Sequence, residues 1–426
     1  MKQRLGYLVL MALAFLLVAA PGYSASTEEL EKKIDLLADE VDDLKNRGFG
    51  SGTSDHNRVT IHGYGEFHVN ADTTQDGDTE IDNHRFVIGI HALLTDWIHL
   101  NAEIDYEHAA QELEFELGYL DFLINPAFNI RAGVLLAPVG LLNETHEPNL
   151  FWTAERPLLQ SRLIPSTWNS GGAGIFGTPM DGVNYRLYAM GSLQSITNDE
   201  TADGGGNGGS GGSGSSFSAN KGIRSGRAQA NERIANDWSV FARVEFTKLF
   251  PGLQVGFSVV NGDTTQGIIA EGGNMTLIEA DIKYRWKWFD MNASIVNTAV
   301  DDAAALNNFC DNGNSGNRCD TTSGSTAIAS NNFGYNIQAG VHLPQLLGWK
   351  TTYDIIPHFM FERVRTQDEM PDGFAANEAF NRNEIYTFGV VYLPTPSVAI
   401  KIDHTHTKLG NDSSTDKLNL AIAYMY

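Results

Sequence analysis

The segment WIHLNAEIDYE, residues 97–107, decides the fold class of this 426-residue chain, because polar and apolar side chains alternate along its whole length. One face carries Ile98, Leu100, Ala102, Ile104 and Tyr106. The other face carries His99, Asn101, Glu103, Asp105 and Glu107. A period of two residues predicts a β-strand with one apolar and one polar face. Such a strand suits a soluble sandwich as well as a membrane barrel, so the rest of the chain must distinguish them.

The same alternation recurs in sixteen segments, joined by connectors that are short and long in turn. The segments lie near 58–70, 83–95, 97–107, 112–123, 128–136, 172–178, 183–192, 237–247, 252–260, 275–286, 289–297, 332–343, 349–363, 384–393, 398–407 and 417–426. Only the connector 108–111 is short where a long one is due. Short turns alternating with long loops are typical of outer-membrane barrels. The sequence therefore predicts an all-β fold, a 16-stranded antiparallel transmembrane β-barrel over residues 58–426.

The last segment agrees with this prediction. LNLAIAYMY, residues 418–426, alternates in the same way and ends on an aromatic side chain, Tyr426. It resembles the terminal strand that the barrel-assembly machinery recognises in outer-membrane proteins. The outer membrane of a bacterial cell, with its lipid as the surrounding solvent, is therefore the expected location.

The first 57 residues have a different character. Lys2 and Arg4 precede a short apolar run that ends in small residues, which predicts a secretory signal peptide over residues 1–25. The heptad spacing of residues 26–47 predicts a short coiled-coil helix, and the glycine-containing segment 48–57 is expected to be a flexible linker. We expect this helix to support an oligomer; the alternative is an amphipathic helix lying on its own barrel.

The triplet Gly63-Tyr64-Gly65 resembles a potassium-channel filter, but it falls inside the first predicted strand. A strand uses its carbonyl groups in the ladder, so the triplet cannot line a pore with them. Both glycines fall on the outer face. Either they admit a neighbouring subunit at close range, or they ease the curvature of the strand.

Several classes of function are disfavoured. The formal net charge of −23 excludes a nucleic-acid partner, because phosphate binding needs basic patches. The pattern Gly-x-Ser-x-Gly occurs only at 208–212, within a glycine-rich stretch that no predicted strand directly precedes and no predicted helix follows, so it is not a nucleophile elbow; neither an enzyme activity nor a cofactor is expected. His404 and His406 share one face but lack a third ligand, so no metal site is expected. Cys310 and Cys319 lie in a secreted chain and predict a disulfide.

The connector after the fifth strand, residues 137–172, is long and rich in apolar side chains such as Phe151, Trp152 and Trp168. A loop of this composition needs a surface to pack against, and the inside wall of a wide barrel offers one. We therefore predict a constriction loop inside the lumen. Its charged residues are Glu144, Glu147 (which precedes Pro148), Glu155, Arg156 and Arg162.

The strand pattern also assigns the charged side chains that line the pore. The inward acids are Glu66, Glu103, Asp105, Glu107, Glu112, Glu114, Glu116, Glu245, Glu279, Asp281, Asp354, Glu362 and Asp403. The inward bases are Arg85, Arg131, Arg186, Arg243, Lys283, Arg285 and Lys401. Acids thus outnumber bases on the wall.

The short 108–111 connection predicts opposed carboxylates on strands three and four. Glu107 should face Glu112, Asp105 should face Glu114, and Glu103 should face Glu116. Like charges that face each other cost stability, so a compensating cation is expected. Arg85 should face Glu107, and Arg131 should lie diagonal to Glu116; the alternative is a solvated acidic wall screened by salt.

The segment FNIRAGVLLAPVGLLNE, with Gly133, Pro138 and Gly140, resembles the phosphate-selective porin O/P family of trimeric bacterial porins. The resemblance implies a homotrimer that passes small hydrophilic solutes by diffusion. Members of that family line their pores with Arg and Lys, from which the acidic wall of this chain departs. We therefore expect a porin with a water-filled, weakly cation-preferring channel. The alternatives are an anion- or phosphate-selective porin, in which Arg131, Arg156 and Arg162 meet at the constriction, or a sheath barrel that docks a partner such as an electron carrier.

Overall fold

The computed structural model describes residues 58–74, 77–196, 217–227, 230, 234–270, 272–311 and 327–426. The predicted signal peptide, coiled-coil helix and linker lie outside these residues. Cys319 and the side chain of Cys310 also lie outside them, so the disulfide stays a prediction.

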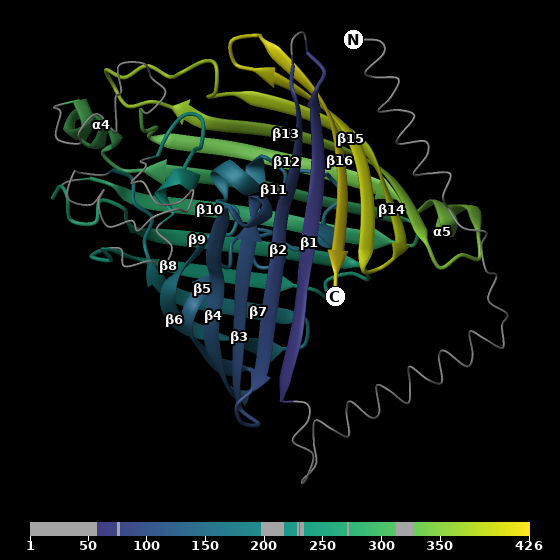
Figure 1. The fold of residues 1–426 in the computed structure, drawn as a ribbon. Coiled ribbons are helices and arrows are strands. Elements are labelled where there is room, and N and C mark those ends of the chain that lie inside the picture. Colours follow the sequence, from purple (N-terminus) through teal and green to yellow (C-terminus); the bar gives the residue numbers. More distant parts are fainter. Residues whose placement is uncertain are drawn as a thin grey trace.

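All sixteen predicted strands are present, and they form one closed antiparallel barrel (Figure 1). Each strand pairs with its neighbours in sequence, and β1 closes the barrel against β16. The strands are β1 Val59–Asp72, β2 Thr79–Leu93, β3 Ile98–Glu107, β4 Glu112–Asn125, β5 Phe128–Leu136, β6 Asn169–Met180, β7 Val183–Gly191, β8 Trp238–Phe246, β9 Leu253–Asp263, β10 Asn274–Trp286, β11 Phe289–Val300, β12 Asn331–Val341, β13 Asp354–Glu369, β14 Asn383–Thr395, β15 Val398–Leu409 and β16 Ser414–Met425.

Short helices occupy some of the connections. They are η1 His108–Ala110, η2 Pro148–Leu150, η3 Leu159–Leu163, η4 Arg224–Gly226, α4 Ala303–Asp311 and α5 Leu343–Leu347. Among the described residues, no helix is both long and apolar enough to cross a bilayer.

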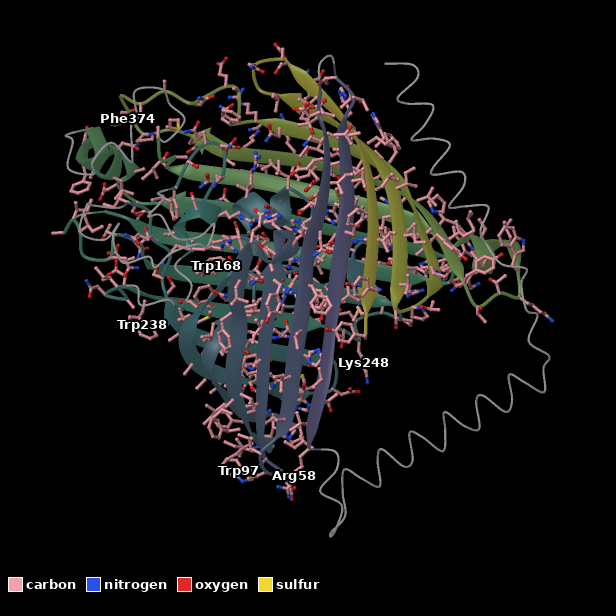
Figure 2. All side chains as sticks on the ribbon, in the orientation of Figure 1. Arg58, Trp97, Trp168, Trp238, Lys248 and Phe374 are labelled. Carbon is pink, nitrogen blue, oxygen red and sulfur yellow. The ribbon has the colours of Figure 1, made fainter. Side chains whose placement is uncertain are left out.

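The outer surface of the barrel is apolar, as the strand period requires. Along β10 the buried Leu277, Glu279 and Asp281 alternate with the exposed Ile278 and Ile282. The same alternation leaves large apolar side chains exposed on other strands, among them Phe115, Leu187, Phe257, Ile295, Ile337 and Phe388. Aromatic side chains stand at both ends of the wall, represented in Figure 2 by Trp97 and Trp238. This surface is the apolar band with aromatic edges that a membrane barrel presents to lipid.

The two glycines of β1 are covered by the C-terminal tyrosines of the same chain. A Cβ atom on Gly63 would lie 2.6 Å from the hydroxyl of Tyr426, and one on Gly65 would lie 2.6 Å from that of Tyr424. The Tyr426 hydroxyl donates to the carbonyl of Val87 on β2, 3.1 Å away. Aromatic rings therefore fill the gap that the glycines leave where the barrel closes, and a neighbouring subunit is not needed to explain them.

Replacing Gly63 with alanine should destabilise the barrel. A Cβ atom there would lie 2.2 Å from the backbone carbonyl oxygen of Val87, so the ladder between β1 and β2 would have to shift. A matched control is Gly171→Ala on β6, where the nearest atom to the new Cβ is 3.9 Å away. Samples are heated to a series of temperatures in SDS and run on gels in the cold, where folded and unfolded barrels migrate differently. We expect the folded band of Gly63→Ala to disappear at a lower temperature than that of wild type. The folded band of Gly171→Ala should disappear at the wild-type temperature. Equal unfolding temperatures would show that the seam tolerates the extra carbon.

The interior contains an apolar cluster that the strand pattern did not predict. Inward-facing Tyr188, Phe241, Val260, Leu277 and Val296, on β7 to β11, are all buried. The loops that fold onto them contribute Leu159, Leu163, Ile164, Trp168, Leu193, Ile196, Phe217, Ile223 and Leu306. On this side the loops of the chain fill the barrel. Only the remaining part of the cross-section of the lumen is left open to water.

Candidate constriction site

The predicted constriction loop does fold into the barrel, where it reaches the strands opposite its own. It spans residues 137–168, because β6 begins at Asn169, earlier than expected. On β15 the fully buried Lys401 donates to the carbonyl oxygens of Pro148, at 2.6 Å, and Thr153, at 3.0 Å. The Lys401 ammonium also lies 3.9 Å from the centre of the Phe151 ring. One lysine thus ties the middle of the loop to the wall.

Two buried carboxylates hold the next part of the loop. Asp403 on β15 accepts a hydrogen bond from the backbone N–H of Ala154, at 2.6 Å. Glu362 on β13 accepts from the backbone N–H groups of Leu158 and Leu159, at 2.9 and 3.0 Å. These N–H groups stand at the start of η3, where a helix leaves its donors without partners and favours negative charge. Two acids predicted to line a pore therefore serve as anchors of the loop.

A third anchor joins the loop to β1 and β4. The imidazole of His146 lies 2.6 Å from the Glu116 carboxylate and 2.7 Å from the Tyr64 hydroxyl. Tyr64 also donates to Glu116, at 3.2 Å. All three side chains are buried. The expected pairing of Glu116 with Glu103 is wrong, because Glu103 pairs with Leu117 and Ile104 with Phe115, which leaves Glu116 as the extra residue of a bulge.

The wall beside this anchor is acidic, and one arginine lies at its centre. Arg85 lies 3.3 Å from Glu66, 3.7 Å from Asp105 and 2.9 Å from Glu107. The predicted pairing of Arg85 with Glu107 across β2 and β3 is confirmed. The pairings of Glu107 with Glu112 and of Asp105 with Glu114 are also confirmed. Arg85 therefore compensates the β3 members of the opposed carboxylates, Asp105 and Glu107.

Arg131 is not near Glu116, contrary to the prediction. It lies directly opposite Asp121 on β4, and its guanidinium donates to both carboxylate oxygens at 2.7 and 2.9 Å. The rings of Tyr119 and Phe176 lie 4.0 and 4.8 Å from it. The prediction failed because the strand register is set by the Leu123–Phe128 turn. Arg131 is thus an element of the wall and does not meet the loop arginines.

The wall across the barrel carries a second arginine among acids. Arg243 on β8 lies 3.0 Å from Glu245, 3.3 Å from Glu279 and 2.7 Å from Asp281, and only 2 % of its side chain is exposed. Its neighbour Arg186 lies 2.9 Å from Glu245 and 3.0 Å from Glu144 of the loop. Most of the inward acids in this half of the wall are therefore paired.

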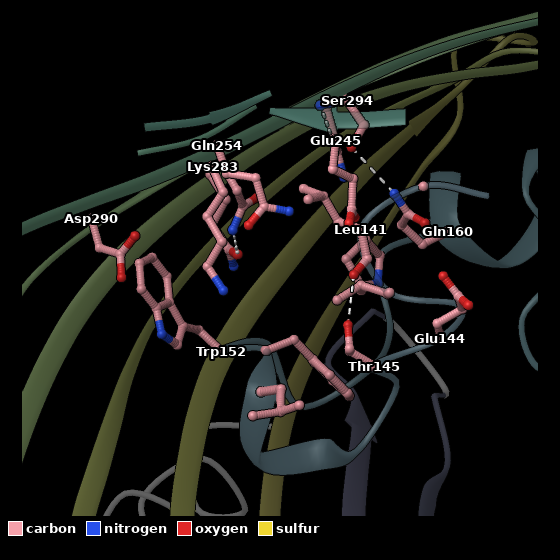
Figure 3. A pocket seen from close by; sticks show the side chains of 18 of the residues that line it. Leu141, Glu144, Thr145, Trp152, Gln160, Glu245, Gln254, Lys283, Asp290 and Ser294 are labelled. Atoms are coloured by element: carbon pink, nitrogen blue, oxygen red, sulfur yellow. Dashed lines mark hydrogen bonds between the residues drawn. The ribbon is translucent and has the colours of Figure 1, made fainter. Parts of the chain in front are cut away.

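Two polar cavities lie on either side of the loop. The outer cavity, about 790 Å³, is lined by the ends of β1, β2, β14, β15 and β16 near the long connectors, and by loop residues including Thr153, Glu155 and Arg156. The inner cavity, about 250 Å³, lies toward the short turns. Figure 3 shows this inner cavity, with Thr145 and Trp152 on its loop side and Lys283 and Asp290 on its wall side. The loop therefore lies between two polar cavities inside the barrel.

Two arginines of the outer cavity, Arg156 and Arg224, form no salt bridge with the residues that the structure describes. Arg156 donates to the Thr167 hydroxyl and the His146 carbonyl, both at 3.4 Å, and Arg224 donates to the hydroxyls of Ser161 and Ser166. Within the described part of the chain, no carboxylate lies within 4.0 Å of either guanidinium. Burial, together with the positive charges of Arg227 and Arg156, lowers the pKa of Arg224 to about 9. The cavity thus has a basic loop side and an acidic wall side.

The remaining predicted residues are dispersed. Glu155 accepts hydrogen bonds from Asn70, at 2.7 Å, and lies 3.0 Å from His68. Arg162 lines the outer cavity near Glu362, and Glu147 lies just before η2. Sequence reasoning missed Arg224, because it follows the glycine-rich stretch 203–216 in a connector without any periodic pattern.

Comparisons with known proteins agree on the fold. No protein-family model matches the chain. An uncharacterised protein of Aquifex aeolicus is 27% identical over 375 residues, which cover 86% of this chain and 80% of that protein. Among solved structures, the anion-selective porin of Comamonas acidovorans has a TM-score of 0.52 at 10% identity, covering 86% of this chain and 99% of that one. Salmonella typhi OmpF in complex with daunomycin has a TM-score of 0.53 at 11% identity, and the match covers 86% of this chain and 97% of OmpF. The outer-membrane channel DcaP of Acinetobacter baumannii has a TM-score of 0.52 at 9% identity, and the match covers 88% of this chain and 100% of DcaP.

The fold and its surface determine where the protein resides. A closed barrel with an apolar, aromatic-edged outer face is stable only in a bilayer, and barrels of this architecture are outer-membrane proteins. The protein is therefore an outer-membrane β-barrel with the fold of a porin, and the phosphate-selective branch is one of several porin types that share this fold.

Proposed function

We propose that the protein is a porin that lets ions and small hydrophilic solutes diffuse passively across the outer membrane. The observation that carries the proposal is the loop anchored inside the barrel with a polar cavity on each side of it. A barrel of this strand number encloses more space than side chains fill, so water occupies what the loops leave free. The loop then sets the size and charge of the passage.

Assembly as a homotrimer through residues 26–47 belongs to the same proposal, with the barrel wall as a second contact. A sheath barrel for an electron carrier is less well supported. The interior is occupied by the chain's own loops, and a cavity of about 790 Å³ accommodates a small solute but no folded partner.

We propose a weak preference for cations. Seven carboxylates and five Lys or Arg side chains line the outer cavity, and the inner cavity has three of each. The excess is small, and at about 0.15 M salt the Debye length is about 8 Å, so the preference should be modest and strongest in dilute salt. The anion-selective alternative is supported by Arg156 and Arg224, which form no salt bridge with any carboxylate of the described residues.

Reversal potentials in a KCl gradient across a planar bilayer test the proposal. Wild type should reverse on the cation side, and the double variant Arg156→Gln, Arg224→Gln should move further in that direction. Lys248→Gln is the control, because Lys248 pairs with Asp181 in a short turn outside both cavities. If the reversal potential of wild type instead indicates anion preference, and the double variant loses that preference, the anion-selective alternative is supported. Inserted protein that never conducts would refute the porin itself.

A further inference from the structure

Three side chains that can bind a metal ion meet at the rim of the outer cavity. They are Asp82 and His84 on β2 and His108 in η1. The Oδ2 atom of Asp82 lies 3.1 Å from Nδ1 of His84 and 2.9 Å from Nδ1 of His108. All three ligand atoms lie within 4.8 Å of one another. Their side chains are 18 to 38 % exposed, so they are reachable from the cavity yet held in place.

A β-bulge in β2 places His84 on the lumen side of the wall together with its neighbour Arg85, while Asp82 also faces the lumen. Glu66 pairs with Arg85 and His68 pairs with Asp82, so two residues of β2 stand opposite Phe67 of β1 alone. In a regular strand neighbours two apart share a face and adjacent residues do not. Here both His84 and the adjacent Arg85 line the cavity. Bulges commonly redirect a side chain in this way next to functional sites.

The turn after β3 supplies the third ligand through an unusual backbone. His108, Ala109 and Ala110 all have positive φ angles, of 50°, 56° and 69°, which residues other than glycine rarely adopt. Such strained conformations persist only where the surrounding structure holds them in place. This turn brings the His108 imidazole over β2, where it contacts the Asp82 carboxylate.

The surroundings favour a bound cation and hold the ligands. The ring of His68 stacks on that of His84 at 4.8 Å, with 7° between the two planes. His68 is in turn fixed by Glu66 and Glu155, each 3.0 Å away. On the other side of His108 stand the opposed carboxylates of Glu107 and Glu112. The site therefore has three converging donors, a stacked supporting ring and negative charge nearby.

We propose that Asp82, His84 and His108 bind a divalent first-row transition ion such as Zn²⁺. Two imidazole nitrogens and one carboxylate oxygen form a ligand set that Zn²⁺, Co²⁺ and Ni²⁺ accept, whereas Mg²⁺ and Ca²⁺ prefer oxygen ligands. The ion would replace the contacts that the Asp82 carboxylate now makes with the two imidazoles. Water completes the coordination from the cavity, because only three protein ligands are present. The site was not expected from the sequence, where the metal-like pair was His404 and His406.

Binding of CoCl₂ and ZnCl₂ to the full-length protein in detergent tests the site without reference to conduction. Wild type should bind about one ion per chain, with visible absorption bands for Co²⁺ that added Zn²⁺ removes and MgCl₂ does not. His84→Gln with His108→Gln should weaken binding at least tenfold, and Asp82→Asn should weaken it less. Cold-gel mobility must first show that each variant is folded.

His404→Gln with His406→Gln provides the matched control, since these residues lie near Asp416 on the same half of the barrel but line neither cavity. The control should bind as wild type does. Equal affinity in wild type and the His84, His108 variant would overturn the proposal, and so would loss of binding in the control alone.

A second readout rests on the proposed function. A bound Zn²⁺ adds two positive charges to a cavity lined by seven carboxylates and five basic side chains. Micromolar Zn²⁺ should therefore move the reversal potential of wild type toward zero and leave that of the His84, His108 variant unchanged. Binding without this shift would retain the metal site and count against the outer cavity as the selective part of the channel.

Discussion

Arg243→Met is expected to destabilise the barrel by about 3–5 kcal/mol, because removal of one partner from a buried ion pair leaves uncompensated charge. The guanidinium of Arg243 contacts Glu245, Glu279 and Asp281, and Glu279 and Asp281 are both 1 % exposed. Methionine fills a similar volume but offers no positive charge to these carboxylates. The fraction of protein that refolds when it is diluted from urea into detergent should fall sharply. This fraction is measured as the intensity of the folded band on SDS gels run without heating the sample.

Arg285→Met on β10 is the matched control, since Arg285 is exposed and faces the lumen without a recorded salt bridge among the described residues. It should refold as wild type does. Adding Glu279→Gln and Asp281→Asn to Arg243→Met should restore much of the refolding, because the variant then has fewer unpaired charges. Normal refolding of Arg243→Met alone would show that water in the lumen screens these acids.

Lys401→Met is expected to release the constriction loop and leave the barrel folded. The variant removes two hydrogen bonds from a charged donor, each contributing about 1.5–3 kcal/mol, and the contact with the Phe151 ring. The barrel itself should persist, because an apolar side chain of similar size is tolerated in a buried site. Single-channel recordings should show larger conductance and more noise in the open state.

Limited trypsin digestion provides an independent measure of the same release, because Arg162 in the loop is then accessible for cleavage. Lys408→Met is the control: Lys408 is on the same strand, is 52 % exposed and does not contact the loop. Unchanged conductance, noise and proteolysis in Lys401→Met would show that Glu362, Asp403 and His146 hold the loop without it.

The fold was predictable because its rule is local. Alternating side chains in segments such as WIHLNAEIDYE must separate lipid from lumen, and the pairing of Glu107 with Glu112 follows directly from the short 108–111 connection. The candidate site was only partly predictable. The position of the loop inside the barrel could be inferred from Phe151, Trp152 and Trp168, but the partners of its charges could not.

The errors have a common origin in strand register and in long-range packing. A single bulge in β4 moved Glu116 from a carboxylate pair to His146, and another in β2 let the adjacent residues His84 and Arg85 both face the lumen. No local sequence pattern indicates a bulge here, because a strand with one extra residue has the same kinds of residues as a regular strand. In the same way, Arg224 follows a glycine-rich stretch and reaches the cavity only because its loop packs against the apolar side of the lumen.

The sequence by itself determined the number of strands, their order, the closed antiparallel barrel and the residue types on each face, since these depend on a period of two and on connector length. Only the tertiary structure decided which charges meet. Lys401, Asp403 and Glu362 bind a loop more than 200 positions away in the chain, at contacts 253, 249 and 204 residues apart. Such pairings depend on how the loop packs inside a closed wall, and no spacing between neighbouring residues encodes that geometry.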